Sequence, residues 1–95
     1  MYVILIYDIS MIELRQGAKV SRNVFKICKK YLTHIQKSVF EGELTPAKLQ
    51  KLRNELAQYL REDLDSVVIF KSKQKKGLDK EFWAADESEK TSNFF

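Results

Sequence analysis

The sequence predicts one small α+β domain in which two helices cover one face of a sheet. Apolar, strand-like segments occupy residues 1–8 and 66–70, and two amphipathic helical patterns with an extended segment between them fill the interval. Right-handed crossovers place both helices on the same side of such a sheet. A chain of 95 residues has the length of one domain.

The first strand is predicted at Met1–Asp8. Its apolar run shows no alternation, which is typical of a central strand buried on both faces. The run ends on the carboxylate of Asp8, and open sheets often carry their functional groups at strand ends. Asp8 is therefore the first candidate site residue; the alternative is an acid that only caps a turn or a helix.

The first helix is predicted to follow a turn at residues 9–13 and to end near Tyr31. Its start is open between Leu14 and Ser21, because Gly17 disfavours a helix interior and Ser21 is a good cap. Apolar residues at spacings of three and four form one buried stripe: Val20, Val24, Ile27, Cys28 and Tyr31.

The segment 33–44 is predicted to be extended. Polar residues first alternate with Ile35 and Val39, but the apolar side then shifts to Phe40. This change of period indicates either a bulge near residues 37–39 or a break into two short strands, and the sequence leaves both open.

The second helix is predicted to start at Thr45-Pro46, a hydroxyl cap followed by proline in the first helical position. It is expected to end near Arg61, and a polar connection then leads to a strand at Ser66–Phe70. Its apolar stripe consists of four leucines at helical spacing: Leu49, Leu52, Leu56 and Leu60.

Four lysines follow the last strand: Lys71, Lys73, Lys75 and Lys76. They are either a solvated strand end that discourages edge pairing or a phosphate-binding group. The segment 77–95 contains Phe82, Trp83, Phe94 and Phe95, whereas a disordered tail seldom carries so many aromatic residues. We therefore predict a core domain over 1–76 and a tail over 77–95 that docks on another surface.

The composition favours an anionic partner. The net charge of +4 and the pI near 9.2 are mildly basic, and a pair of chains would carry twice that charge. Cys28 is the only cysteine, so we expect a core thiol in a reducing compartment and no internal disulfide. The opening apolar run is too short to span a bilayer, which predicts a cytoplasmic protein without a membrane partner.

Several kinds of site are excluded within one chain. His34 is the only histidine, so neither a histidine metal cluster nor a histidine-based triad can form, and a surface position is expected for it. The three glycines, Gly17, Gly42 and Gly77, do not form a phosphate-binding loop.

The two predicted helices can cover only one face of the sheet, although the first and last strands are apolar on both. The second face must be buried by the tail or by another molecule, and a symmetric homodimer is the common solution. Two Asp8 carboxylates near the twofold axis would repel each other unless a cation lay between them. Magnesium or manganese would suit such oxygen ligands and could activate water at a phosphodiester.

Two motifs resemble one known family. The first strand closes with Tyr7-Asp8-Ile9-Ser10, and residues 36–42 read Gln-Lys-Ser-Val-Phe-Glu-Gly within a longer matching segment, 31–44. The final residues, 92–95, are also similar. Over nearly its whole length, the chain resembles the small CRISPR-associated nucleases of the Cas2 family.

The resemblance implies a ferredoxin-like domain of βαββαβ type, which forms a homodimer through its sheets while the C-terminal tail adds a strand to the partner subunit. It also implies a metal-dependent endonuclease that cleaves single-stranded RNA or double-stranded DNA. Members are further described as the central dimer of the complex with the CRISPR integrase, Cas1, which captures new spacers. The expected partners are therefore a second copy, the integrase, DNA and RNA.

The resemblance also assigns roles to individual residues. Asp8 corresponds to the metal-binding, catalytic aspartate, and Phe40 to a structural phenylalanine near the site. Arg15 corresponds to an arginine that holds phosphate, a role that suits a planar guanidinium. The other residues expected to contact nucleic acid are Tyr7, Lys19, Arg22, His34, Lys71 and Lys73.

Three alternatives stay open. The chain could be a catalytically inactive DNA-binding assembly adaptor, in which Asp8 is incidental, or a toxin-type ribonuclease on the same scaffold. A monomeric RNA-recognition domain would instead stack bases on an open sheet. The solution mass separates that last reading from a dimer, and the substitution Asp8→Ala separates the nuclease from the adaptor.

Overall fold

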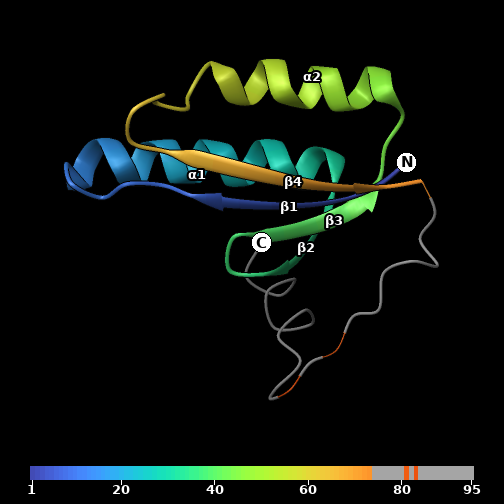
Figure 1. The fold of residues 1–95 in the computed structure, drawn as a ribbon. Coiled ribbons are helices and arrows are strands. Elements are labelled where there is room, and N and C mark those ends of the chain that lie inside the picture. Colours follow the sequence, from blue (N-terminus) through green and yellow to red (C-terminus); the bar gives the residue numbers. More distant parts are fainter. Residues whose placement is uncertain (74–80, 82, 84–95) are drawn as a thin grey trace.

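The computed structural model describes residues 1–73, 81 and 83. It contains a four-stranded antiparallel sheet with two helices on one face, as Figure 1 shows. Along the chain the elements are β1 (Tyr2–Asp8), α1 (Leu14–Tyr31), β2 (Thr33–Gln36), β3 (Val39–Glu43), α2 (Pro46–Ala57) and β4 (Ser66–Ser72). The strand order β2-β3-β1-β4 is that of a ferredoxin-like βαββαβ domain, so the predicted α+β fold is confirmed.

β1 is a central strand, as predicted, with β3 on one side and β4 on the other. From Val3 to Asp8 its side chains alternate between two environments. Val3, Leu5 and Tyr7 are buried beneath the helices, whereas Ile6 is 38% exposed and Asp8 is exposed. The prediction that this strand is buried on both faces is therefore wrong for a single chain, because α1 and α2 cover the same face.

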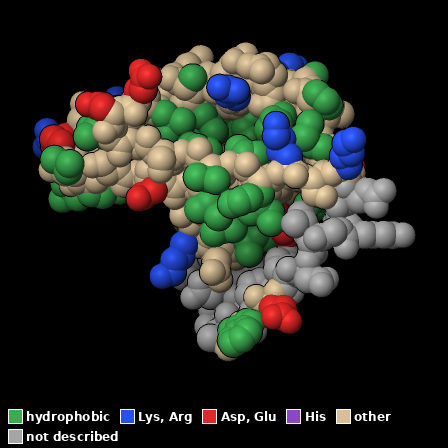
Figure 2. Space-filling view, viewed as in Figure 1, with side chains coloured by type: hydrophobic (Ala, Val, Ile, Leu, Met, Phe, Trp, Pro, Cys, Tyr) green, Lys and Arg blue, Asp and Glu red, His purple; other side chains and the backbone are tan. Residues whose placement is uncertain are grey.

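The other face of the sheet carries exposed apolar side chains. Ile6 pairs with Val68 and Ile4 pairs with Phe70 across β1 and β4, so these side chains share one face. Val68 and Phe70 are 49% and 54% exposed. Figure 2 shows hydrophobic side chains gathered below the helix layer, on the side of the sheet away from α1 and α2. We call Ile4, Ile6, Val68 and Phe70 the open sheet face; it agrees with the uncovered apolar surface expected from the sequence.

α1 begins at Leu14, at the early end of the predicted interval. The Glu13 carboxylate caps the helix by accepting hydrogen bonds from the backbone N–H groups of Arg15 and Gln16, at 3.3 and 2.8 Å. Ser21 lies inside the helix, so the alternative start there is wrong.

Residues 33–44 form two strands that are joined by a tight turn at Lys37-Ser38. Lys37 adopts a φ of 43°, the left-handed conformation that such a turn requires. The break into two strands is thus the correct alternative. The pairing of β2 with β3 is irregular between His34 and Gln36, which accounts for the shift in apolar period.

α2 begins as predicted, with Thr45 as its cap and Pro46 in its first turn. The Thr45 hydroxyl accepts a hydrogen bond of 3.2 Å from the backbone N–H of the third helical residue. The helix ends at Ala57, four residues before the predicted end at Arg61. Two backbone N–H groups of the following turn donate to the carbonyl oxygen of Leu56, which tightens the chain and ends the helix.

The core lies between the sheet and the two helices. Its largest fully buried side chains come from the sheet and from both predicted helical stripes: Phe40, Leu5, Leu52, Val3, Val24 and Cys28. Cys28 has the core position predicted for it, and burial raises the pKa of its thiol to about 12.

Of the predicted tail over 77–95, the structure describes only residues 81 and 83; the rest of the tail, together with Lys75 and Lys76, lies outside the described residues. No helix in the described part of the chain combines the length and the apolar character that a bilayer span requires.

Candidate nucleic-acid and metal site

Asp8 is the last residue of β1 and lies opposite Ser66, the first residue of β4. Its side chain is exposed, and the alternation along β1 puts it on the same side as Ile6, at one end of the open sheet face. Among the described residues, no group of three or more His, Cys, Asp and Glu side chains could enclose a metal ion. Within the described residues, Asp8 is therefore not part of a cluster of that size.

Tyr7 points to the opposite side of the sheet from Asp8. Its ring is buried beneath the helices and stacks on Phe40, with 6.1 Å between the ring centroids. Burial raises the pKa of the Tyr7 phenol to about 12, so it stays neutral at neutral pH. Tyr7 therefore lies in the core, where its ring anchors the strand that carries Asp8, and its contact with nucleic acid stays a prediction.

His34 is buried, so the predicted surface position is wrong. It lies opposite Phe40, whose side chain faces the core, and the two ring centroids are 4.7 Å apart. The edge of the ring meets Phe25, also at 4.7 Å, and Nε2 lies 2.6 Å from the carbonyl oxygen of Lys37. A ring held in this way exposes little surface to a phosphate, and the nucleic-acid contact of His34 stays a prediction.

The outer face of α1 carries a row of basic side chains, and α1 contains no acidic residue. Five positions fall within an arc of roughly 80° on an ideal helix and span about 21 Å along its axis, opposite the buried stripe. We call them the α1 basic row: Arg15, Lys19, Arg22, Lys26 and Lys29, all exposed.

The α1 basic row and Asp8 lie on different surfaces, because the row faces away from the sheet and Asp8 stands on the open sheet face. Only Arg15, in the first turn of α1, is close to Asp8 along the chain. Lys26 and Lys29 were not among the predicted contact residues, although their spacing of three and four residues from the other basic residues indicates them. Lys30 is set apart from the row by its ion pair with Glu55 of α2.

Lys71 and Lys73 are exposed near the end of β4. Lys71 lies opposite Val3, whereas Asp8 lies opposite Ser66 at the start of the strand. The rise of a strand puts about 17 Å between these two positions. The structure therefore does not bring the two lysines to Asp8.

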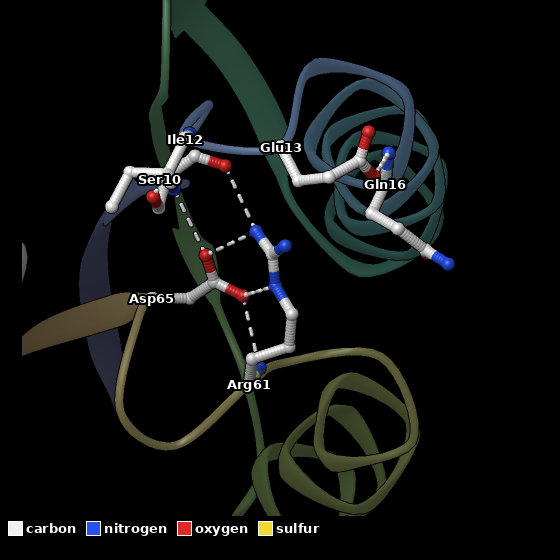
Figure 3. A network of polar contacts seen from close by, with 6 residues as sticks. All are labelled: Ser10, Ile12, Glu13, Gln16, Arg61 and Asp65. Atoms are coloured by element: carbon white, nitrogen blue, oxygen red, sulfur yellow. Dashed lines mark hydrogen bonds and ion pairs between the residues drawn. The ribbon is translucent and has the colours of Figure 1, made fainter.

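A polar network next to Asp8 joins the β1–α1 loop to the α2–β4 connection, as Figure 3 shows. The carboxylate of Asp65 accepts hydrogen bonds of 2.9 Å from the backbone N–H groups of Ser10 and Arg61. The Arg61 guanidinium donates to both Asp65 oxygens and to the carbonyl oxygen of Ser10, again at 2.9 Å. These bonds, those from the Arg61 side chain above all, lower the pKa of Asp65 to about 2.

Residues 62–65 were expected to be only a polar connection, and this network was not predicted from the sequence. The available signal was the pair of opposite charges at a spacing of four, Arg61 and Asp65.

Comparison with known proteins identifies the family. The sequence profile of the family described as CRISPR associated protein Cas2 matches residues 1–78. The chain belongs to the Cas2 family. The CRISPR-associated endoribonuclease Cas2 of Fusobacterium nucleatum is 49% identical over 94 residues, which cover 99% of this chain and 86% of that relative. The second Cas2 of Moorella thermoacetica is 35% identical over 92 residues, which cover 97% and 99% of the two chains.

Solved Cas2 structures have the same fold. One Cas2 crystal structure superposes with a TM-score of 0.78 at 38% identity, and covers 93% of this chain and 91% of its own. Streptococcus pyogenes Cas2, in a crystal structure at pH 6.5, gives a TM-score of 0.72 at 30% identity and covers 86% and 100% of the two chains.

The donor atoms at Asp8 in this Cas2 chain fit one part of a magnesium site. A carboxylate is the hard oxygen ligand that magnesium prefers, and the exposure of Asp8 leaves room for the waters that the ion retains. Tyr7 cannot add a ligand, because its neutral phenol is buried on the other face. Asp8 would therefore be one ligand of such an ion, and waters or groups from other molecules would fill the remaining positions.

Proposed function

We propose that the chain is a homodimeric, magnesium-dependent endonuclease that hydrolyses phosphodiester bonds in RNA or DNA, with manganese as an alternative ion. The observation that carries the proposal is the exposed Asp8 carboxylate at the end of the central strand, beside the apolar open sheet face. The names of the relatives, which are CRISPR-associated endoribonucleases, support it.

Pairing through the open sheet face would bury apolar side chains that a single chain exposes, Val68 and Phe70 among them. Such an interface is isologous, so each surface meets its own copy. Asp8 stands at one end of this face, and two copies of it would then share the rim of one interface. The predicted tail over 77–95 would dock on the partner subunit.

A magnesium ion held by the two Asp8 carboxylates would supply a Lewis acid and an activated water at neutral pH. The other residues of the chain bind and orient the substrate. Arg15, Lys19 and Arg22 would hold backbone phosphates along α1, and Lys71 and Lys73 would do so at the far end of β4. Contacts of this kind do not read bases, so we expect little sequence preference.

Asp8→Ala tests the proposal. The substitution should lower magnesium-dependent cleavage of RNA or DNA at least about 100-fold, since even the outer partners of metal ligands contribute about 10- to 100-fold. Binding of DNA in the presence of a chelator should not change. Asp63→Ala, which removes another exposed carboxylate, is the matched control and should cleave as the wild type does. Wild-type cleavage by Asp8→Ala would remove Asp8 from the mechanism.

A second candidate function is a DNA-binding adaptor without nuclease activity, which joins subunits of the CRISPR integrase in the cytoplasm at the centre of the complex that acquires new spacers. The α1 basic row favours this reading, because it is exposed and lies away from Asp8. An adaptor would bind duplex DNA and the integrase with wild-type affinity after Asp8→Ala, and neither it nor the wild type would show cleavage.

A further inference from the structure

The β1–α1 loop leaves Asp8 and leads to Arg15, and it is held from the side of the α2–β4 connection. Both backbone groups of Ser10 are bound there: its N–H donates to Asp65 and its carbonyl oxygen accepts from Arg61, each at 2.9 Å. The Asp65 side chain is fully buried and that of Arg61 is 22% exposed. Arg61 and Asp65 thus bind both backbone hydrogen-bonding groups of Ser10, as a neighbouring strand does in a β-sheet.

The same loop is also held from the side of α1. A Cβ atom on Gly17 would overlap the carbonyl oxygen of Ser10, the atom that accepts from Arg61. Glycine is therefore required inside α1 because the loop packs directly against the helix backbone. The loop is further ordered by the N–H of Ile12, which donates to the Ser10 hydroxyl at 3.3 Å, and by the Glu13 cap.

The network flanks Asp8 on both strands, β1 and β4. Ser10 lies two residues after Asp8, and Asp65 directly precedes Ser66, the residue opposite Asp8 in β4. A change in the Arg61–Asp65 pair therefore moves the loop after Asp8 and the strand start beside it together.

We propose that Arg61 and Asp65 are positioning residues for the Asp8 site, which hold the β1–α1 loop so that Asp8 and Arg15 keep a fixed separation. This proposal rests on the proposed function, because the fixed separation matters only where Asp8 acts. The pair touches neither substrate nor metal and works through the backbone of Ser10. A functional site needs such support, since small displacements of its groups cost activity.

Two variants, on different elements, test the proposal. Asp65→Asn keeps the shape of the side chain, but its amide donors face the Arg61 guanidinium, so the acceptor of the Ser10 N–H is lost or displaced. Gly17→Ala pushes the Ser10 carbonyl away from Arg61 from the opposite side. Leu49→Ala is the control, because it removes core packing near the start of α2, away from the network.

Amide hydrogen exchange of residues 9–13 in the full chain is the first measurement, and it does not depend on any activity. Both variants should speed exchange in the loop about tenfold or more relative to the wild type, measured where all variants are fully folded. Leu49→Ala should leave the loop unchanged. Loop exchange at the wild-type rate in Asp65→Asn would overturn the proposal, whatever the protein catalyses.

Asp8-dependent cleavage is the second measurement. Both variants should reduce it about 10- to 100-fold and raise the magnesium concentration at half-maximal rate, whereas Leu49→Ala should not. Faster loop exchange with wild-type cleavage and magnesium dependence would mean that the pair only stabilises the fold, and would overturn the positioning role. If the wild type itself shows no Asp8-dependent cleavage, the proposed function fails. Amide hydrogen exchange of residues 9–13 then remains the test of whether Arg61 and Asp65 hold the β1–α1 loop.

Discussion

The Asp65 carboxylate accepts four hydrogen bonds, three of them from Arg61 and one from the backbone of Ser10. Each of these bonds favours the ionised form, and together they outweigh the opposing effect of desolvation. The group is therefore both a structural link and a source of pH dependence. Because the partners lie in two separate connections, its protonation would release the β1–α1 loop.

The acid stability of the protein should depend on Asp65. Its pKa is about 2 in the folded chain against an ordinary 3.8, so the stabilisation is fully present above about pH 4 and is lost as the pH falls toward 2. Asp65→Asn should lower the free energy of unfolding at pH 7 by about 3 kcal/mol and should flatten its decline between pH 4 and pH 2. Urea denaturation across this range measures both.

The control for this measurement is Asp63→Asn, an exposed carboxylate in the same connection. It should keep the wild-type slope between pH 4 and pH 2. Equal slopes for Asp65→Asn and the wild type would contradict the role assigned to Asp65.

Single residues were predictable from the sequence where the local pattern decides their position. The position of Asp8 at a strand end could be predicted because it ends an apolar run, and the core position of Cys28 because it lies on a helical stripe. His34 and Tyr7 were misplaced, because the pairing of β2 and β3 and the alternation along β1 decide which face they occupy. The contact of Ser10 with Asp65 spans 55 residues, and no local pattern reports it.

At the scale of elements, α1 separates apolar and charged residues onto opposite faces. The buried side of the helix completes the core, and the outer side carries the α1 basic row. The α1 basic row is about 21 Å long. A duplex carries one phosphate charge per about 1.7 Å of its axis, so a stretch of this length contains about 12 phosphates. Exposed aromatic rings, which single strands need for stacking, are not part of the row.

The row should contribute most of the electrostatic affinity for duplex DNA. The triple variant Lys19→Gln/Arg22→Gln/Lys26→Gln should weaken binding at low salt at least about tenfold and reduce the salt slope of log K by about 3, since each phosphate contact adds about 0.9. Fluorescence anisotropy with a labelled duplex and a chelator, titrated at several salt concentrations, gives both values.

A second triple variant, Lys37→Gln/Lys48→Gln/Arg53→Gln, removes the same charge from exposed positions outside the row. This variant should keep most of the wild-type salt slope of log K for duplex binding. If both triples lose affinity equally, net charge rather than the row explains binding.

The boundaries of the elements show where local signals suffice. Thr45 and Pro46 fixed the start of α2, since cap chemistry is local. Gly17 did not indicate where α1 begins. Glycine disfavours a helix interior, but a glycine is needed at this position inside α1 because Ser10 packs directly against it. The turn at Lys37-Ser38 could not be located from the sequence, because Lys37 is not a residue typical of a positive φ.

At the scale of the whole molecule, the two sides differ in character. The helix side presents the α1 basic row, whereas the other side presents the open sheet face with the carboxylate of Asp8 at one end. The uncovered surface could be predicted from the sequence, because two helices on the same side cover only one face of a sheet whose first and last strands are apolar on both faces. The strand order, by contrast, followed only from the family resemblance.

The oligomeric state should depend on the open sheet face. Wild-type protein should have twice the mass of one 11.2 kDa chain by light scattering, and Phe70→Glu should shift it to a single chain, because it adds a charge to an apolar interface. Leu14→Glu is the control: Leu14 is 71% exposed, lies outside this face, and should leave the dimer intact. A wild-type monomer would instead favour a single-domain RNA binder that stacks bases on its sheet.

The central place of β1 has a consequence during synthesis of the chain. β1 is made before the other described elements, yet one of its two neighbours, β4, begins only at Ser66, after both helices have been made. Until then one edge of β1 has no partner, and it is open to pairing with another nascent chain. Asp8 consequently gains its neighbour in β4 late, and polysomes that crowd many copies together are where misassembly of this protein should begin.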